Sequence, residues 1–153
     1  MSDRALPRQT YKTTEHDQIE REVARRFAKW TRSTSLKIGT DPHDKQKARV
    51  DRAFCRGGNI VAFAEIKSCS AEFGTRHTGW AVGLDKVESC RALFQVVRVP
   101  VLIIVKFGCG TVAYLDCNTE FERIERFGRS DRNDPVDYEV GARFQWSRFK
   151  VVK

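Results

Sequence analysis

Apolar residues recur at helical spacing in two parts of the chain. The first lies between residues 14 and 32, where intervals of four, four and three residues place one apolar stripe along a helix. That stripe consists of Ile19, Val23, Phe27 and Trp30. The second lies between Leu84 and Val97, where apolar positions again follow a helical period. We therefore expect two helices, one near the start and one in the middle of the sequence.

Runs of β-branched and aromatic residues predict the strands. The two runs on either side of the segment CRGGN are expected to form a hairpin, because paired glycines can adopt the positive φ of a tight turn. Two later runs are almost wholly apolar, as strands covered on both faces must be. In chain order the four runs are Arg49–Phe54, Ile60–Lys67, Val99–Phe107 and Thr111–Cys117. We expect the third to be the central strand of a sheet.

The remaining segments have weaker patterns. Residues 68–83 contain three glycines and no clean period, which predicts a long loop. Short extended pieces are expected at Ser35–Ile38 and Trp80–Val82. In the tail, Thr119–Phe127 is expected to form a short helix and Ala142–Val152 a strand.

The predicted order of elements is helix, hairpin, helix, strand and strand. This order is typical of an α/β sandwich in which helices flank a central mixed sheet. With 153 residues the chain has the size of one ordinary domain. We therefore predict a single domain over residues 1–153, with a flexible segment at residues 1–13 and a C-terminal extension at residues 118–153 whose structure the pattern does not define.

The chain is basic, since 28 Lys and Arg against 20 Asp and Glu give a formal charge of +8. A surplus of this sign favours a polyanionic partner, and nucleic acid is the leading candidate. A basic protein without such a partner remains the alternative. Side chains that could bind nucleic acid are Arg25, Arg26 and Lys29 on the first helix and Arg76 and Trp80 on the loop. A solvated helix face and a tryptophan that caps the core are the competing interpretations.

The sequence shows no pattern typical of a signal peptide, a membrane-spanning helix, a disulfide framework or a zinc ribbon. The first residues lack the apolar segment of a signal peptide, and no run reaches the ~20 apolar residues that span a bilayer. We therefore expect the protein to be cytoplasmic. Its five cysteines form no CxxC pair, so neither a disulfide framework nor a zinc ribbon is indicated.

Three charged residues interrupt the predicted hairpin: Asp51, Glu65 and Lys67. Because side chains alternate across a strand, Glu65 and Lys67 share one face. A three-residue turn at residues 57–59 would place Asp51 directly opposite Glu65, with Cβ atoms about 5 Å apart. A two- or four-residue turn would instead pair Asp51 with Ala64. The register of the hairpin therefore decides whether the two acids meet.

Two facing carboxylates repel each other, and a divalent cation removes that repulsion. Carboxylate oxygens, helped by the backbone carbonyl of Ile66, suit Mg²⁺ or Mn²⁺. Such an ion can activate water and neutralise charge on a phosphate, while Lys67 orients that water or stabilises the same charge. The pattern fits phosphodiester hydrolysis. The alternative is an ordinary salt-bridge cluster on a solvated sheet face, which contributes about 0–1 kcal/mol per exposed pair.

At these residues the sequence resembles the PD-(D/E)XK nuclease superfamily, which has the restriction-endonuclease-like fold. The resemblance consists of Asp51 in RVDRAF, the EIK triplet Glu65-Ile66-Lys67, and a following helix and strand VPVLIIVKF. It implies that Asp51 and Glu65 bind the metal with the carbonyl of Ile66, and that Lys67 is the catalytic lysine. It also implies an acidic residue on the first helix, a position that Glu20 fits. A valine stands where the family's motif has proline.

Within the superfamily the sequence resembles the small archaeal-type Holliday junction resolvases, through IEREVARRF around Glu20, EIKS and VPVLIIVKF. This resemblance implies a basic homodimer that acts on branched DNA. The expected function is a divalent-metal-dependent DNA endonuclease. The alternatives are a DNA-binding or structural module that kept the fold without catalysis, and a basic interaction protein with a salt-bridged hairpin. Lys86 and Gln95 of the second helix could contact phosphate, and the sequence selects neither.

Overall fold

The computed structural model describes residues 14–38, 50–75, 78–128 and 138–153, and its main feature is a six-stranded sheet. The strands of this sheet are β1 (Thr34–Lys37), β2 (Arg52–Arg56), β3 (Asn59–Ser68), β5 (Val101–Lys106), β6 (Val112–Asp116) and β9 (Lys150–Val151). They lie in the order β1-β2-β3-β5-β6-β9. Because β3 and β5 are parallel and the other neighbours are antiparallel, the sheet is mixed, as predicted.

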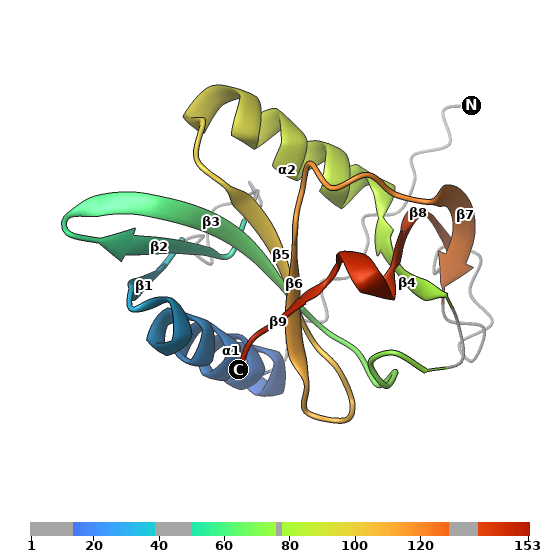
Figure 1. Ribbon diagram of the computed structural model, residues 1–153, viewed down its shortest axis with the longest axis horizontal. Coiled ribbons are helices and arrows are strands. Elements are labelled where there is room, and N and C mark those ends of the chain that lie inside the picture. The colour runs from blue at the N-terminus through green and yellow to red at the C-terminus, as the bar shows by residue number, and fades with distance from the viewer. Residues whose placement is uncertain (1–13, 39–49, 76–77, 129–137) are drawn as a thin grey trace, which may run out of the picture.

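Two helices cover opposite faces of the large sheet (Figure 1). The first is α1 (Thr14–Thr31) and the second is α2 (Leu84–Val97), so both predicted helices are confirmed. β5 lies inside the sheet and is buried from Val101 to Val105, which confirms the prediction of a strand covered on both faces. Among the helices that the structure describes, none is long and apolar enough to cross a membrane.

The alternation of side chains along β3 divides the core into two halves. Ala64 and Ile66 belong to the half that α1 covers, whereas the register with β5 places Glu65 opposite Ile103 in the half that α2 covers. Lys67 has the same parity as Glu65 and lies opposite Val105. The two charged residues of the EIK triplet are therefore on the α2 side of the sheet.

The predicted β2–β3 hairpin is confirmed, and its turn is one of the alternatives that the sequence left open. The turn has two residues, Gly57 and Gly58, both with positive φ (57° and 79°), as a tight hairpin turn requires. A two-residue turn alone would have paired Asp51 with Ala64. However, a β-bulge between Phe54 and Cys55 shifts the register by one residue, so that Arg52 pairs with Ala64. Continued by one residue, that register brings Asp51 to the level of Glu65.

The C-terminal extension forms a second sheet rather than a helix. β7 (Arg123–Gly128) and β8 (Tyr138–Gln145) pair with β4 (Gly79–Gly83) in the order β4-β8-β7. The predicted helix at Thr119–Phe127 is therefore wrong, and the predicted strand at Ala142–Val152 is in fact β8, a short 3₁₀ turn and β9. The segment predicted as flexible, residues 1–13, lies outside the described residues.

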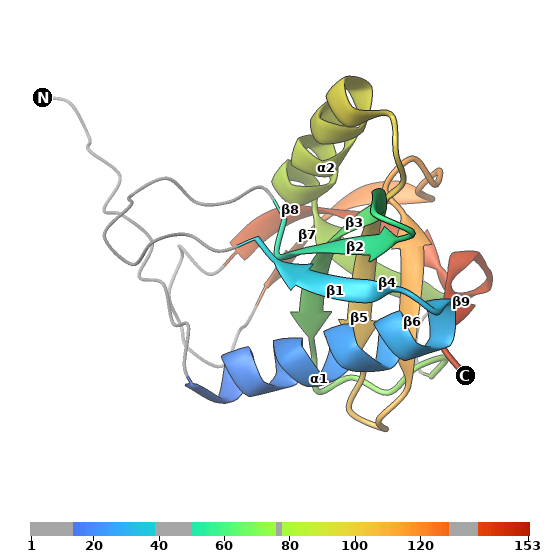
Figure 2. The same cartoon turned by 90° about the vertical axis from the view of Figure 1, so that its left-hand side faces the viewer.

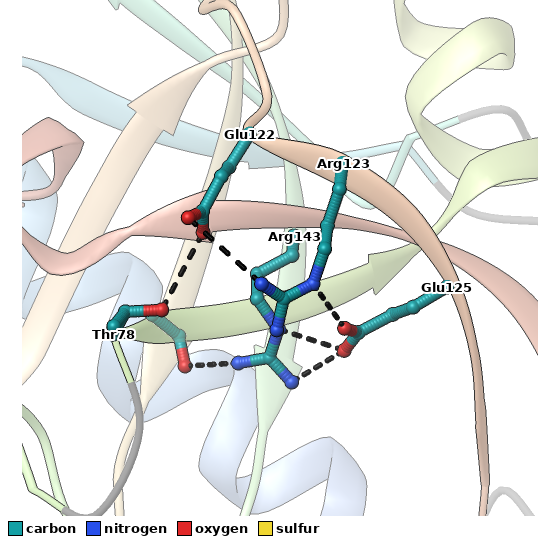
Figure 3. Close-up of polar contacts among 6 residues, drawn as sticks. Thr78, Glu122, Arg123, Glu125 and Arg143 are labelled. Atoms are coloured by element: carbon teal, nitrogen blue, oxygen red, sulfur yellow. Dashed lines mark hydrogen bonds and ion pairs between the residues drawn. The ribbon is translucent and has the colours of Figure 1, made fainter.

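Polar contacts join the three strands of the second sheet (Figure 3). Arg143 of β8 donates to the carbonyl of Gly79 on β4 at 2.7 Å and, through Nε, to Glu125 of β7 at 2.8 Å. Arg123 donates to the same carboxylate at 3.1 Å. Just before β4, the hydroxyl of Thr78 donates to the carboxylate of Glu122 at 3.4 Å. Together these contacts hold the start of β4 against the other two strands.

Candidate active site

Asp51 lies in a bend immediately before β2, and its backbone and side chain are both held by neighbouring strands. Its N–H donates to the carbonyl of Ala64 at 2.9 Å, and its carbonyl accepts from the N–H of Ile38 at 2.9 Å. Its Oδ2 atom accepts from the N–H of Ile66 at 2.8 Å. The carboxylate thus takes the place of a backbone acceptor at the edge of β3 and is fixed beside the EIK triplet.

Glu65 is 5% exposed and carries two lysine partners. The Nζ atom of Lys67 lies 3.2 Å from Oε1 of Glu65, and the Nζ atom of Lys86, on α2, lies 3.1 Å from the same oxygen. The lysine side chains are 39% and 27% exposed, so each ammonium also reaches solvent. A buried carboxylate without a partner would be strongly unfavourable, and these two cations compensate it.

The thiol of Cys90 shows that these groups share one region. Burial, followed by the negative charge of Glu65, raises the pKa of Cys90 to about 11. The charges of Lys86, Lys67 and Asp51 act on the same thiol. The register of β3 places Glu65 and Lys67 on the α2 side of the sheet, and the hydrogen bond from the N–H of Ile66 holds the Asp51 carboxylate beside this triplet. Burial leaves Cys90 a neutral thiol that is not poised as a nucleophile.

The oxygen atoms around Asp51 and Glu65 fit a hard divalent cation. Both carboxylates bear lone pairs beyond the contacts described. Because a strand residue directs its N–H and C=O towards the same neighbour, Ile66 directs its carbonyl to the Asp51 edge as well. Two carboxylates and one carbonyl, with water completing the shell, suit Mg²⁺ or Mn²⁺. Within the described ranges, no group of three or more His, Cys, Asp or Glu side chains lies close enough together to hold a metal ion.

Glu20, the predicted acid of the first helix, lies in a different environment. It is 6% exposed, and its Oε1 accepts from Nε of Arg52 at 3.0 Å. Both side chains of this pair are buried, with 7% and 10% exposure. The structure does not group Glu20 with Asp51 and Glu65 as side-chain metal ligands, and its catalytic role stays a prediction.

A basic groove runs between α1 and β1, which lie next to each other in Figure 2. Four cationic side chains line it: Arg21, Arg25, Lys29 and Arg52. The hydroxyl residues Ser33, Thr34 and Ser35 complete its wall. Arg21, Arg25 and Lys29 follow one another at intervals of four residues on the exposed face of α1, so they form one row of charge. One of the four lining cations, Arg52, directly follows Asp51 in the sequence.

The other side chains predicted to bind nucleic acid have different positions. Arg26 turns to the C-terminal end of the chain, where it donates to the carbonyls of Gly110 at 3.1 Å and Val152 at 3.3 Å. Trp80 is half-buried and packs edge-on against Phe107, with ring centroids 5.7 Å apart, so it caps the core. Arg76 lies outside the described residues.

Sequence reasoning considered Lys86 and did not select it. The signal that distinguishes it is its place in the first turn of a helix, where the positive end of the helix dipole disfavours a cation. A lysine at such a position calls for a local acid, and the structure shows that Glu65 is that acid.

Comparisons with known proteins agree with this geometry. Residues 6–152 match a family described as "Phage putative PDDEXK endonuclease". The fold is similar to that of Hjc, a Holliday junction resolvase from the archaeal hyperthermophile Archaeoglobus fulgidus, with a TM-score of 0.57 and 11% identity over 86% of this chain and 88% of that one. No curated protein matches the chain. The match over nearly all of the chain and the Hjc-like, restriction-endonuclease-like fold show that this protein belongs to the phage PDDEXK endonuclease family.

Proposed function

We propose that this protein is a divalent-metal-dependent endonuclease that hydrolyses phosphodiester bonds of DNA with Asp51, Glu65 and Lys67. The observation that carries the proposal is the fixed position of the two acids. The carboxylate of Asp51 is hydrogen-bonded to the backbone of Ile66, next to the buried carboxylate of Glu65. Family membership supports the reaction class, and the row of cations in the groove supports a polyanionic substrate.

The reaction adds one water across a P–O bond. The water oxygen bonds to phosphorus, the bond to one sugar oxygen breaks, and that leaving oxygen takes a proton from the water. A divalent cation bound by Asp51 and Glu65 supplies Lewis-acid stabilisation of the phosphate charge and activates water. Asp51 and Glu65 hold the ion, Ile66 contributes its carbonyl, and the partly exposed ammonium of Lys67 stabilises charge that develops on the phosphate oxygens.

The row of cations along α1 supports DNA as the substrate. Arg21, Arg25 and Lys29 form no ion pair among the described residues, so they are available to phosphates. The groove that they line also includes Arg52, which follows Asp51 in the sequence. In this proposal, phosphates of the DNA backbone contact the row of cations along α1. The predictions that Arg26, Arg76 and Trp80 contact DNA are separate from this one.

The test is cleavage of supercoiled plasmid and of linear duplex DNA with Mg²⁺, with Mn²⁺ and with a chelator. We expect nicking or linearisation only with the metals, and none in Asp51→Ala or Lys67→Ala. Glu120→Gln and Lys150→Ala serve as matched controls, because both residues are exposed and far along the chain from the site. Full activity in Asp51→Ala or Lys67→Ala would remove the proposed site.

A catalytically inactive DNA-binding module is the second candidate. The observation that favours it is that two lysines already neutralise Glu65 without any metal. Such a module would bind DNA with a steep salt dependence and show neither cleavage nor metal binding that depends on Asp51 and Glu65. Calorimetric titration with Mn²⁺, run on wild type and Asp51→Asn, separates the two candidates.

Branched DNA and a homodimer are further parts of the proposal. They are supported by the similarity of the fold to that of a Holliday junction resolvase. Cleavage rates on a four-way junction and on a linear duplex of the same sequence would test the substrate. Light scattering on the purified chain would test the dimer. Equal rates on both substrates would remove branched-DNA preference and leave the nuclease proposal intact.

A further inference from the structure

Lys86 occupies a position that the proposed reaction has not yet used. It is the third residue of α2, and its ammonium lies 3.1 Å from Oε1 of Glu65. The ammonium of Lys67 contacts the same oxygen at 3.2 Å. One lysine comes from the strand and the other from the helix above it, so Glu65 is held between two separate elements.

The charges of the site balance only when both lysines are counted. Asp51 and Glu65 contribute two negative charges, and Lys67 and Lys86 contribute two positive charges, so the four groups are neutral together. A bound divalent cation leaves a surplus of two positive charges. A phosphodiester carries one negative charge and gains a second when hydroxide adds to phosphorus, so this surplus matches the reacting group. Without Lys86 the site would be one charge short.

The helix itself offers no reason for a lysine at this point. Lys86 lies in the first turn of α2, where the dipole disfavours positive charge, and the acidic residue of that turn is its neighbour Asp85. The ammonium is directed to Glu65 of the sheet instead, and the side chain as a whole is still 27% exposed. It can therefore leave Glu65 without a large rearrangement, because a lysine has a flexible stem and a strongly hydrated head.

We propose that Lys86 is a second substrate-binding lysine: it pairs with Glu65 in the free protein and moves to a non-bridging oxygen of the scissile phosphate when Glu65 binds a divalent cation. This inference rests on the proposed nuclease function. It makes Lys86 a competitor of the metal before DNA binds and a partner of the DNA afterwards. Its removal should therefore affect metal binding and cleavage in opposite directions.

The test is Lys86→Met, which keeps the length of the side chain and removes its charge. In calorimetric titration with Mn²⁺ and no DNA, we expect tighter binding, on the order of five-fold, because the competing ion pair is lost. In cleavage of plasmid DNA at saturating metal, we expect a rate about 10²-fold lower, as for loss of one donor to a developing oxyanion. Lys86→Arg should recover part of the rate.

The matched control is Lys106→Met. Lys106 also lies 3.1 Å from a glutamate oxygen, that of Glu22, and is 28% exposed, but its pair contains neither of the two acids. Lys106→Met should change neither the affinity for Mn²⁺ nor the rate of DNA cleavage. If Lys86→Met folds and binds Mn²⁺ no more tightly than wild type, or cleaves at the wild-type rate, the role of Lys86 is overturned and the nuclease proposal stands. If wild type shows no metal binding that depends on Glu65, both proposals fail together.

Discussion

Two glutamates in this molecule are buried to nearly the same extent, and they have opposite surroundings. Glu20 is 6% exposed and pairs with one arginine, whose side chain is 10% exposed. Glu65 is 5% exposed and pairs with two lysines that are 39% and 27% exposed. The side chain of Arg52 is buried with Glu20, whereas the side chains of both lysines reach solvent. The same burial therefore gives a fixed structural pair in one case and an acid that can exchange its partners in the other.

Among the variants that test this difference between the two glutamates, Glu65→Gln should have the largest effect, which is on the rate of DNA cleavage. We expect cleavage to fall by about 10³-fold or more, because one of the two proposed acidic metal ligands is lost. The free energy of unfolding should change by less than about 1 kcal/mol, since both lysines still reach solvent. Plasmid cleavage and urea denaturation of the same preparation measure the two quantities. A loss of several kcal/mol with cleavage retained would assign Glu65 to structure.

Arg52→Met should show the reverse behaviour. It removes the buried arginine that pairs with the carboxylate of Glu20, and we expect the free energy of unfolding to fall by about 3–5 kcal/mol. The double variant Glu20→Met/Arg52→Met should regain most of this loss, because a well-packed apolar pair can replace a buried ion pair. Urea denaturation of the single and double variants gives the coupling between the residues.

The same double variant tests the catalytic role that the resemblance implies for Glu20. If the pair is only structural, the folded double variant should cleave DNA at close to the wild-type rate. A folded double variant that binds DNA and does not cleave it would instead place Glu20 among the catalytic acids.

Removal of the positive charges in the groove between α1 and β1 should have an intermediate effect, which is on the affinity for DNA. Replacing Arg21, Arg25 and Lys29 by glutamine removes three cations that are free of ion pairs among the described residues. We expect the slope of log affinity for duplex DNA against log salt to decrease by about 2 to 3, because each phosphate contact contributes about 0.9. Fluorescence anisotropy in the presence of a chelator measures binding without cleavage.

The matched control replaces three other cations, Arg148, Lys150 and Lys153, by glutamine. They are exposed at the C-terminal end of the chain, so the net charge falls by the same amount. An equal loss of slope in both triple variants would mean that DNA responds to the overall charge of the protein and not to the groove.

The sequence alone predicted the helices and strands whose apolar residues follow a clear pattern. The stripes of α1 and α2 and the apolar run of β5 each bury enough surface to fix their own secondary structure. The acids could be placed only conditionally, because the turn at Gly57 and Gly58 and the bulge near Cys55 shift the register in opposite senses. A bulge of this kind has no reliable signal in a single sequence.

The strands of the second sheet and the lysine partners of Glu65 could not be predicted from the sequence, because they depend on contacts between distant parts of the chain. β7 and β8 are stabilised as strands by pairing with each other and, for β8, with β4, which lies before α2, β5 and β6 in the chain. Ile124 and Val140 are both 54% exposed, so the strands show no clear alternation of buried and exposed positions. Lys86 contacts Glu65 because the fold packs α2 against the face of β3 that carries Glu65, and the sequence does not specify this packing.

The smallest predicted effect tests the polar network of this second sheet (Figure 3). The hydrogen bond from Arg143 holds the pKa of Glu125 below its ordinary value of 4.5. A depressed folded pKa means that the charged carboxylate stabilises the fold above about pH 4.5, and that this contribution is lost as the pH falls through the folded pKa. Glu125→Gln should therefore lower the free energy of unfolding at neutral pH by less than about 1 kcal/mol.

The pH dependence distinguishes this pair from the network around Glu65. The difference between wild type and Glu125→Gln in thermal unfolding should shrink towards zero as the solution is acidified below about pH 4.5. Metal should not alter that difference, because the arginines that hold Glu125 belong to the second sheet. A difference that persists unchanged at acid pH would mean that Glu125 stabilises β7 by packing and not by its charge.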